Sequence, residues 1–400
     1  MAEQRKGPLA DLRVLDLAVV IAGSMTGTLL ADFGADVVKV ERPGTGDPLR
    51  TWGPFKDGVS LYWKAHNRNK RCITLNMAKP DGQALLKALA SKADVLVESF
   101  QAATMEKWGV GYDDLAKLNP GLVMVRISGF GQDGPYKDRP GFGTIAESMS
   151  GVVHITGFPD QPPVLPAFPM ADEVAGAFGA MSAMMAIHER QKSGKGQWID
   201  LSLYEPLFRL LVPQPTEYAA SGTVRQRIGN ELADGAPRNL YKTKDGKWLS
   251  LSANSQGIFE KLMQTIGQPG LIQDPRFKEM SGRIENRVEL NRIVQDWIGA
   301  RPLAEAMAVM EKGGAVVGPV YDSKMIFEDP QYAARKDMVT VSDPEVGSVT
   351  THAAIPFFSR TPGEVRHAGP RLGQHNESVL GEWLGYDKAK VAKLKADGVI

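Results

Sequence analysis

The sequence predicts an α/β fold built on a doubly wound parallel sheet. The first observation is that short apolar strands alternate with helical segments through the N-terminal half. The second is the abundance of turn-forming residues, 42 glycines and 26 prolines. The third is the length of 400 residues, which exceeds the usual size of one hydrophobic core and predicts two domains.

The N-terminal half begins with a βαβ unit. A short buried strand, residues 13–17, precedes a helix over 26–33 and a second strand over 36–40. Such units make parallel sheets, because the crossover returns the chain to the same end of the sheet. The alternation continues with helices over 83–91 and 112–118, strands over 94–98 and 122–128, and a long helix over 171–191.

The middle of the chain has a different pattern and predicts a second domain over roughly 220–320. Two strands, 241–245 and 248–252, flank a Lys-Asp-Gly turn. Three helices are expected after them, and Asn286 is predicted to cap the second. Their ranges are 256–266, 286–298 and 303–312, and a last helix is expected over 377–383.

Composition excludes several classes of function. Lysine and arginine number 47 against 46 aspartates and glutamates, so the chain has no general attraction for nucleic acid or an anionic membrane. No apolar run approaches the roughly 18 residues of a membrane helix. The polar start lacks the apolar core of a signal peptide. We therefore expect a cytoplasmic protein without a nucleic-acid or membrane partner.

Metal and thiol chemistry are also disfavoured. The single cysteine, Cys72, excludes an internal disulfide and any multi-cysteine metal site. It lies in a predicted strand, where a small core residue is expected. The six histidines do not have the spacing of zinc ligands. We expect no bound metal ion.

One segment imitates a dinucleotide-binding loop. Gly129-Phe-Gly131-Gln-Asp-Gly134 matches G-x-G-x-x-G and follows a predicted strand. That motif also requires a helix to begin at the loop, and Pro135 and Pro140 oppose one. The pattern favours a turn-rich loop over a site and argues against a dehydrogenase.

A basic segment follows the first βαβ unit. Residues 64–71 contain four cations, and Arg42 adds a fifth from the end of the second strand. Such a group suits the phosphates of a nucleotide ligand. The alternative is an ordinary solvated face.

Asp172 stands at the start of the long helix. An aspartate there is commonly an N-cap. The partial positive charge of the helix N-terminus also keeps a carboxylate ionised and nucleophilic at neutral pH. The small residues behind it, among them Gly176 and Gly179, allow close packing and predict a buried helix or an interface.

Motifs in a fixed order span nearly the whole chain. They are residues 14–17 with Ala22-Gly23, 34–42, Gly46-Asp47, 67–71, 94–100, 128–135, Ala171-Asp172, 194–200, 330–335 and Leu372-Gly373. Together they resemble the class III CoA-transferases, a family that includes formyl-CoA, carnitine and dicarboxylate CoA-transferases and has the acyl-CoA racemases as relatives.

The resemblance implies a Rossmann-like large domain with a smaller α+β domain inserted. The large domain would consist of residues 1–215 and 325–400 and the small one of 216–324, in an interlocked homodimer. Asp172 would be the nucleophile, and coenzyme A or acyl-CoA would be a substrate, with no tightly bound cofactor. The expected CoA-binding residues are Val20, Ala22, Arg42, Arg71, Leu75, Phe100, Lys107, Trp108 and Arg139.

The implied chemistry moves CoA from an acyl-CoA donor to a small carboxylic acid. A carboxylate nucleophile attacks the thioester to give a mixed anhydride, and the thiolate returns to form an aspartyl-CoA thioester. Backbone N–H groups of a glycine loop or of the helix start at Asp172 are the expected oxyanion donors. Residues 222–237 are a hypothetical lid that keeps water out.

The residue at position 142 distinguishes transfer from racemisation, and other segments indicate the substrate class. The related racemases need a base–acid pair and carry a histidine where this chain has Phe142, so transfer is favoured over racemisation. A CoA-binding protein without catalysis is the third interpretation. Arg139 lies next to the expected active-site loop, and the segment from His154 to Gly157 resembles members that move CoA among dicarboxylates, so succinyl-CoA is the expected donor. The first loop departs from the family at Val19, Ile21 and Ser24.

Overall fold

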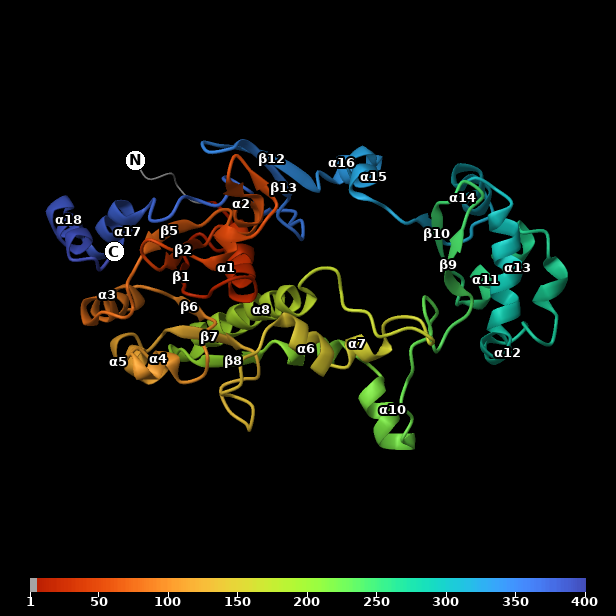
Figure 1. The fold of residues 1–400 in the computed structure, drawn as a ribbon, viewed down its shortest axis with the longest axis horizontal. Helices are drawn as coiled ribbons and strands as arrows, with labels where there is room; N and C mark the ends of the chain where they lie inside the picture. Colours follow the sequence, from red (N-terminus) through yellow and green to blue (C-terminus); the bar gives the residue numbers. More distant parts are fainter. Residues whose placement is uncertain (1–5) are drawn as a thin grey trace. The chain divides into compact units, whose positions relative to one another are not determined.

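The computed structural model describes residues 6–400, so the first five residues of the polar start lie outside the described residues. Packing divides the chain into two compact units. The first contains the chain up to Val152, Leu165–Ala219 and Tyr332–Ile400, and the second contains Val153–Val164 and Ala220–Gln331. Each unit has its own hydrophobic core, and Figure 1 traces the chain through both units. The domain boundaries after residues 215 and 324 and the interlocked dimer stay predictions.

A parallel sheet of six strands forms the centre of the first unit, in the order β5-β2-β1-β6-β7-β8. Numbered within this sheet, the order is 3-2-1-4-5-6, the Rossmann-like arrangement. The predicted doubly wound parallel sheet is therefore confirmed, and the four predicted strands of the first half end within one residue of the observed ones. The strands are β1 (Arg13–Asp16), β2 (Asp36–Glu41), β5 (Arg71–Thr74), β6 (Val95–Glu98), β7 (Val123–Ser128) and β8 (Trp198–Ser202).

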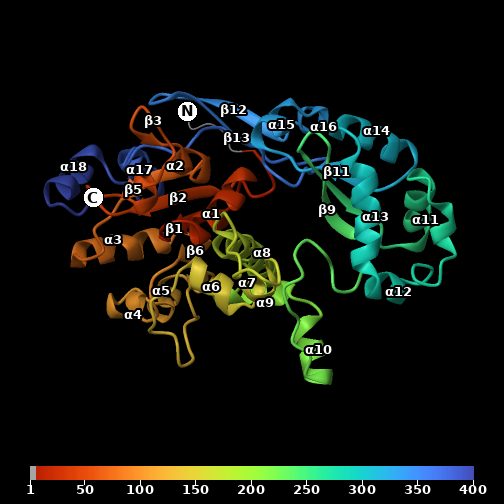
Figure 2. The same cartoon turned by 45° about the vertical axis from the view of Figure 1, so that its right-hand side comes forward.

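Helices cover both faces of this sheet, because successive side chains of each strand point to opposite faces. Val14 packs with α1 (Ala22–Asp32) and α8 (Met170–Ser193). Leu15 packs in the core on the other face. Figure 2 shows the strands of this sheet with helices packed around them. The helices of that second face are α3 (Pro80–Ala90), α5 (Tyr112–Leu118), α17 (Asn376–Leu384) and α18 (Lys388–Ala396).

Helices α1 and α8 lie unusually close together because α8 presents glycines to α1. A Cβ atom on Gly176 would lie 2.5 Å from the Cβ of Met25, and one on Gly179 would lie 2.5 Å from Oγ1 of Thr26. The Thr26 hydroxyl donates a hydrogen bond to the Gly176 carbonyl at 3.0 Å. The expectation of a buried, closely packed helix is confirmed, and this contact fixes the start of α8 beside the start of α1.

Shorter elements connect and flank the main ones. They are the 3₁₀ helix η1 (Pro48–Thr51), β3 (Phe55–Lys56), β4 (Val59–Ser60), α2 (Leu61–His66), α4 (Thr104–Lys107), α6 (Gly143–Met149), α7 (Val152–Ile155), α9 (Tyr204–Leu210), α10 (Gln214–Ser221), α15 (Ser323–Glu328), α16 (Pro330–Arg335), β12 (Met338–Asp343) and β13 (Gly347–His352). None of the described helices is long and apolar enough to cross a membrane.

The second unit packs helices on a three-stranded antiparallel sheet of order β11-β10-β9. The predicted strand at 241–245 is displaced, because Thr243 and Lys247 close the turn and pairing begins at Arg238. Asn286 precedes its helix as predicted, but its side chain donates to the Gly282 carbonyl instead of capping. The elements are β9 (Arg238–Lys242), β10 (Trp248–Ser252), β11 (Val317–Pro319), α11 (Gln256–Thr265), the 3₁₀ helix η2 (Pro269–Ile272), α12 (Met280–Glu285), α13 (Arg287–Gly299) and α14 (Leu303–Lys312).

Candidate active site

A cavity of about 590 Å³ lies at the carboxyl ends of the parallel strands, and the first unit supplies its whole lining. Residues 19–22 reach it from the end of β1, and Ser99 reaches it from the end of β6. These two strands are neighbours at the point where the strand order reverses, the usual ligand position in such sheets. Gly129 and Gly141 also line the cavity, so the loop over a site that the sequence predicts is confirmed.

A buried ion cluster supports the loop that follows β1. The cluster consists of Asp16, Lys39, Asp47 and Lys70. Lys39 lies 3.0 Å from Asp47 and 3.6 Å from Asp16, and Lys70 lies 2.9 Å from Asp16. Burial lowers the pKa of Lys70 to about 8, whereas for Lys39 the neighbouring carboxylates outweigh burial and raise the pKa.

The loop itself has a strained residue at its centre. Val20 has φ of 64°, a left-handed conformation that branched residues rarely adopt. Its N–H donates to both carboxylate oxygens of Asp47, at 3.2 Å each, and the Val19 N–H donates to Oγ of Ser99 at 2.9 Å. The ion cluster and Ser99 therefore hold the loop in the conformation that lines the cavity.

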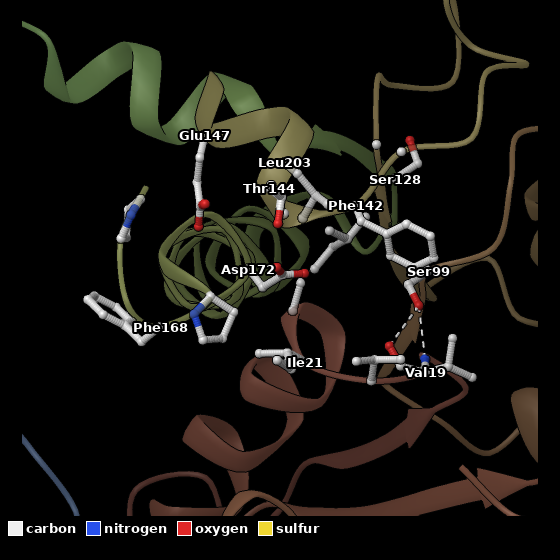
Figure 3. A pocket seen from close by; sticks show the side chains of 18 of the residues that line it. Val19, Ile21, Ser99, Ser128, Phe142, Thr144, Glu147, Phe168, Asp172 and Leu203 are labelled. Carbon is white, nitrogen blue, oxygen red and sulfur yellow. Dashed lines mark hydrogen bonds between the residues drawn. The ribbon is translucent and has the colours of Figure 1, made fainter. Parts of the chain in front are cut away.

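Asp172 is the third residue of α8 and extends its carboxylate toward the cavity (Figure 3). The N-cap interpretation is wrong, because Pro169 occupies the cap position and no side chain caps there. Burial first, and then the charge of Glu147, raise the pKa of Asp172 to about 6. The sequence-based expectation was a carboxylate kept ionised at neutral pH by the helix N-terminus, whereas burial raises the pKa above its ordinary value. The carboxylate is still mainly ionised at pH 7.

Helix α6 crosses the start of α8 and shapes the surroundings of Asp172. A Cβ atom on Gly143, its first residue, would lie only 2.0 Å from Oδ2 of Asp172, so glycine leaves the room that the carboxylate occupies. Four residues later, the buried Glu147 accepts a hydrogen bond from the Ala171 N–H at 3.3 Å. Both residues lie on one face of α6.

Three N–H groups at the start of α8 already have acceptors, and the sequence-based expectation of an oxyanion site there stays a prediction. The N–H groups of Met170 and Glu173 donate to the carbonyls of Phe168 and Pro169, and that of Ala171 donates to Glu147. These three donors are therefore less available to a developing oxyanion than N–H groups without an acceptor would be. Gly141 and Gly143 line the cavity and leave the glycine loop as the other expected source.

A second group of titratable side chains lies beside Asp172. Burial and the charge of Asp172 raise the pKa of Glu173 to about 7. Burial, followed by the charge of Lys70, lowers the pKa of His66 to about 4, so this ring is neutral at pH 7 although it lies 3.9 Å from Glu173. Burial and the charges of Glu173 and Asp172 raise the pKa of Tyr62 to about 12.

The expected CoA-binding residues fall into two groups. Val20 and Ala22 line the cavity itself. Arg42, Leu75 and Phe100 directly follow or lie just beyond the ends of β2, β5 and β6, so they extend the same carboxyl edge. Phe100 contacts Trp108 edge-to-face at 5.2 Å, and Lys107 is exposed beside it. Arg139 is exposed and lies over the ring of Tyr136.

The cations of the basic segment over 64–71 are paired with acids, which weighs against a phosphate site there and against the alternative of a solvated face. Acids from distant parts of the chain neutralise each of its four cations. Lys64 pairs with Asp343 and Glu345, Arg68 with Asp32, and Lys70 with Asp16. Arg71 pairs with Asp36 and Glu382, which weighs against its predicted contact with CoA.

Sequence reasoning missed Glu147 and Trp52, which both line the cavity. Glu147 carried one available signal: it is the only charged residue between Pro140 and Val153. A lone acid in such a run is costly to bury unless it has a partner or a function. Trp52 had no comparable signal.

Known proteins can now be compared with this geometry. The first unit places a carboxylate in a cavity at the switch point of a parallel sheet, a usual ligand position. The family model that matches, over residues 9–376, is that of CoA-transferase family III. The chain belongs to this family and is a CoA-transferase.

Individual relatives agree with that assignment. The chain is 43% identical to the succinyl-CoA–D-citramalate CoA-transferase of Chloroflexus aurantiacus, over 100% of both chains. It is 38% identical to the beta subunit of the succinyl-CoA–L-malate CoA-transferase of the same organism, over 98% of both chains. A solved structure of a CAIB/BAIF family protein from Brucella suis has a TM-score of 0.83 and 32% identity, and the match covers 95% of this chain and 100% of that one.

Proposed function

We propose that this CoA-transferase moves CoA from a dicarboxylic acyl-CoA to a free dicarboxylate through covalent intermediates on Asp172. The observation that carries the proposal is the Asp172 carboxylate, which lies largely buried on the wall of a cavity with no lysine, arginine or histidine in its described lining. A carboxylate that no cation neutralises keeps its nucleophilic lone pairs available. The relatives named for succinyl-CoA, citramalate and malate support the substrate class.

The reaction consists of four displacements that need no proton transfer. Asp172 attacks the thioester carbonyl, a C–O bond forms, the C–S bond breaks, and CoA leaves as its thiolate. The thiolate attacks the aspartyl carbonyl of the mixed anhydride and releases the donor acid, which leaves an aspartyl-CoA thioester. The acceptor carboxylate then attacks this thioester, and the returning thiolate takes the new acyl group and frees Asp172.

This lack of proton transfer fits the groups around the cavity. Racemisation at the α carbon would need a base and an acid on opposite sides of that carbon. Phe142 lies in the cavity where the related racemases carry a histidine, and its side chain has no titratable group. We therefore assign transfer in preference to racemisation. Gly141 and Gly143 are the proposed sources of N–H donors to the oxyanions.

The CoA moiety is proposed to lie along the carboxyl edge of the sheet. Val20 and Ala22 would contact it inside the cavity, and Phe100 and Trp108 offer a joined aromatic surface outside it. The exposed cations Arg42 and Lys107 are the proposed phosphate contacts. The second carboxylate of the substrate would be held by neutral donors of the cavity, Ser128 and Thr144, since the first unit places no cation in the lining.

We also propose that the chain acts as a homodimer. Exposed apolar side chains gather on α6, α8 and α9, and water-exposed apolar area of this kind commonly marks a protein interface. They are Ile145, Met149, Met181, Met185, Phe208 and Leu210. Sedimentation equilibrium of the full chain tests this proposal, and a monomer at micromolar concentration would contradict it.

The test of the mechanism is to trap the intermediate. The protein is incubated with succinyl-CoA, reduced with borohydride, digested, and analysed by mass spectrometry of its peptides. We expect a mass change at Asp172 in the wild type and none in Asp172→Asn. Turnover by a protein whose Asp172 remains unmodified would overturn the mechanism, and entry of solvent deuterium at the α carbon would indicate racemisation instead. Glu189→Gln, which changes an exposed acid at the far end of α8, serves as the matched control.

A further inference from the structure

Helix α6 brings a second carboxylate to the start of α8. Glu147 has a relative exposure of 3%, and Figure 3 shows its side chain reaching from α6 to the first turn of α8, while Asp172 extends from that turn toward the cavity. Its Oε1 accepts the Ala171 N–H, one residue before Asp172. Gly143, one turn earlier on α6, is the residue whose missing side chain makes room for the Asp172 carboxylate. One short helix therefore sets both the space and the charge around the nucleophile.

The position of Glu147 has an electrostatic consequence for Asp172. The N-terminus of a long helix normally stabilises a carboxylate in its first turn. Here a second carboxylate occupies that end of the helix, so its negative charge offsets the favourable potential that Asp172 would otherwise feel. No described cation lines the cavity to restore the balance. The charge of Glu147 therefore raises the free energy of the ionised form of Asp172. It does not raise the free energy of a state in which Asp172 is uncharged.

We propose that Glu147 is a positioning residue that anchors the start of α8 and, through its charge, favours the acylated and uncharged states of Asp172. The inference rests on the proposed role of Asp172 as the nucleophile. In the anhydride and in the aspartyl-CoA thioester, the Asp172 carbonyl carries no charge, so acylation relieves the repulsion as protonation does. The same effect raises the basicity of the carboxylate, and a more basic oxygen is a stronger nucleophile.

Other titratable groups face Asp172 and must be separated from Glu147. Glu173 follows it on α8, Tyr62 of α2 senses its charge, and His66 of α2 lies 3.9 Å from Glu173. Tyr62 and His66 keep one protonation state between pH 5 and 8, because their pKa values are about 12 and about 4. Glu173 titrates in this range, with a pKa of about 7. The measurement is therefore made in the wild-type background and again in a Glu173→Gln background.

The experiment measures the pH dependence of single-turnover acylation of Asp172 by succinyl-CoA, with quenching and mass spectrometry as the readout. Glu147→Gln keeps an oxygen that accepts the Ala171 N–H but removes the charge. We expect its acid limb to move to lower pH by roughly one unit, and the trapped fraction of acylated Asp172 to fall up to about tenfold. Glu147→Asp keeps the charge and should hold the acid limb near its wild-type position, while Glu189→Gln controls for the loss of one charge from the protein.

The outcomes distinguish this inference from the proposed function. A purely structural role for Glu147 predicts that Glu147→Gln acylates with the wild-type pH profile, or that the aspartate variant fails in the same way as the glutamine variant. Either result would overturn the inference while Asp172 remains labelled. An unlabelled Asp172 in the active wild-type protein would instead overturn the proposed mechanism on which the inference rests.

Discussion

Two groups of buried charge in the first unit differ in their partners. The ion cluster of Asp16, Lys39, Asp47 and Lys70 joins two acids with two bases, and it supports the loop after β1. At the start of α8, Glu147 and Asp172 are two acids without a base in the lining they share. In this comparison balanced charge supports a wall of the cavity, whereas unbalanced charge lies at the residue that we propose as the nucleophile.

The largest expected effect comes from breaking the balanced cluster. Lys70→Met leaves Asp16 buried beside fewer cations, and removal of one partner of a buried pair costs about 3–5 kcal/mol. Urea denaturation, with hydrogen exchange of β1 as the probe for the first unit, measures this loss. The exposed pair of Lys117 and Asp114, 3.6 Å apart, offers the control. Lys117→Met should change the free energy of unfolding by less than about 0.5 kcal/mol, and equal effects of the two variants would contradict the comparison.

For the unbalanced acids we expect the opposite effect, in which removal of a charge stabilises the fold. The pKa of Asp172 in the folded chain, about 6, lies above its ordinary value of 3.8, so its ionised form destabilises the fold. This destabilisation is absent well below pH 3.8, grows as the pH rises toward 6, and is complete above pH 6. Asp172→Asn should therefore add about 2–3 kcal/mol of stability at pH 8 and only about 0.5 kcal/mol at pH 4. Thermal unfolding at both pH values tests this, and a gain independent of pH would refute the electrostatic cause.

The smallest effect concerns two arginines that the sequence placed together as CoA ligands. Arg42 is exposed and forms no ion pair with the described residues, whereas Asp36 and Glu382 occupy the guanidinium of Arg71. We expect Arg42→Gln to raise KM for succinyl-CoA by about tenfold, as for one lost charge-assisted hydrogen bond. Arg71→Gln should leave KM within about twofold. Steady-state kinetics of the two variants tests this expectation. A larger rise in KM for Arg71→Gln than for Arg42→Gln would support the sequence-based prediction that Arg71 contacts CoA.

Local sequence patterns predicted much of the fold. The boundaries of α5 and α14 agree with the sequence-based ranges, 112–118 and 303–312, because apolar periodicity and clear end signals coincide there. The position of Asp172 at the start of a closely packed helix could also be predicted, since the small residues at positions 175–183 indicate close packing. These features depend on neighbours in the chain, which a sequence displays.

Pairing between distant residues could not be read in this way. The basic segment looked like a phosphate site because its counter-ions lie at positions 16, 32, 36 and 343, far from it in the chain. Glu147 was overlooked for the same reason, since its importance comes from how α6 crosses α8. A sequence shows the order of the charged residues, but the fold determines which of them form ion pairs.

The contact between α1 and α8 has a consequence for the speed of the reaction. Gly176 and Gly179 place α8 directly against α1, and α1 continues the loop that lines the cavity. The Asp172 carboxylate, which we propose as the nucleophile, and the cavity wall of residues 19–22 are therefore both held by this packed pair of helices. Two groups held in this way react at a high effective concentration, because the orientational entropy is lost during folding and not at each turnover. A methyl group between these helices would thus slow acylation even where acyl-CoA still binds.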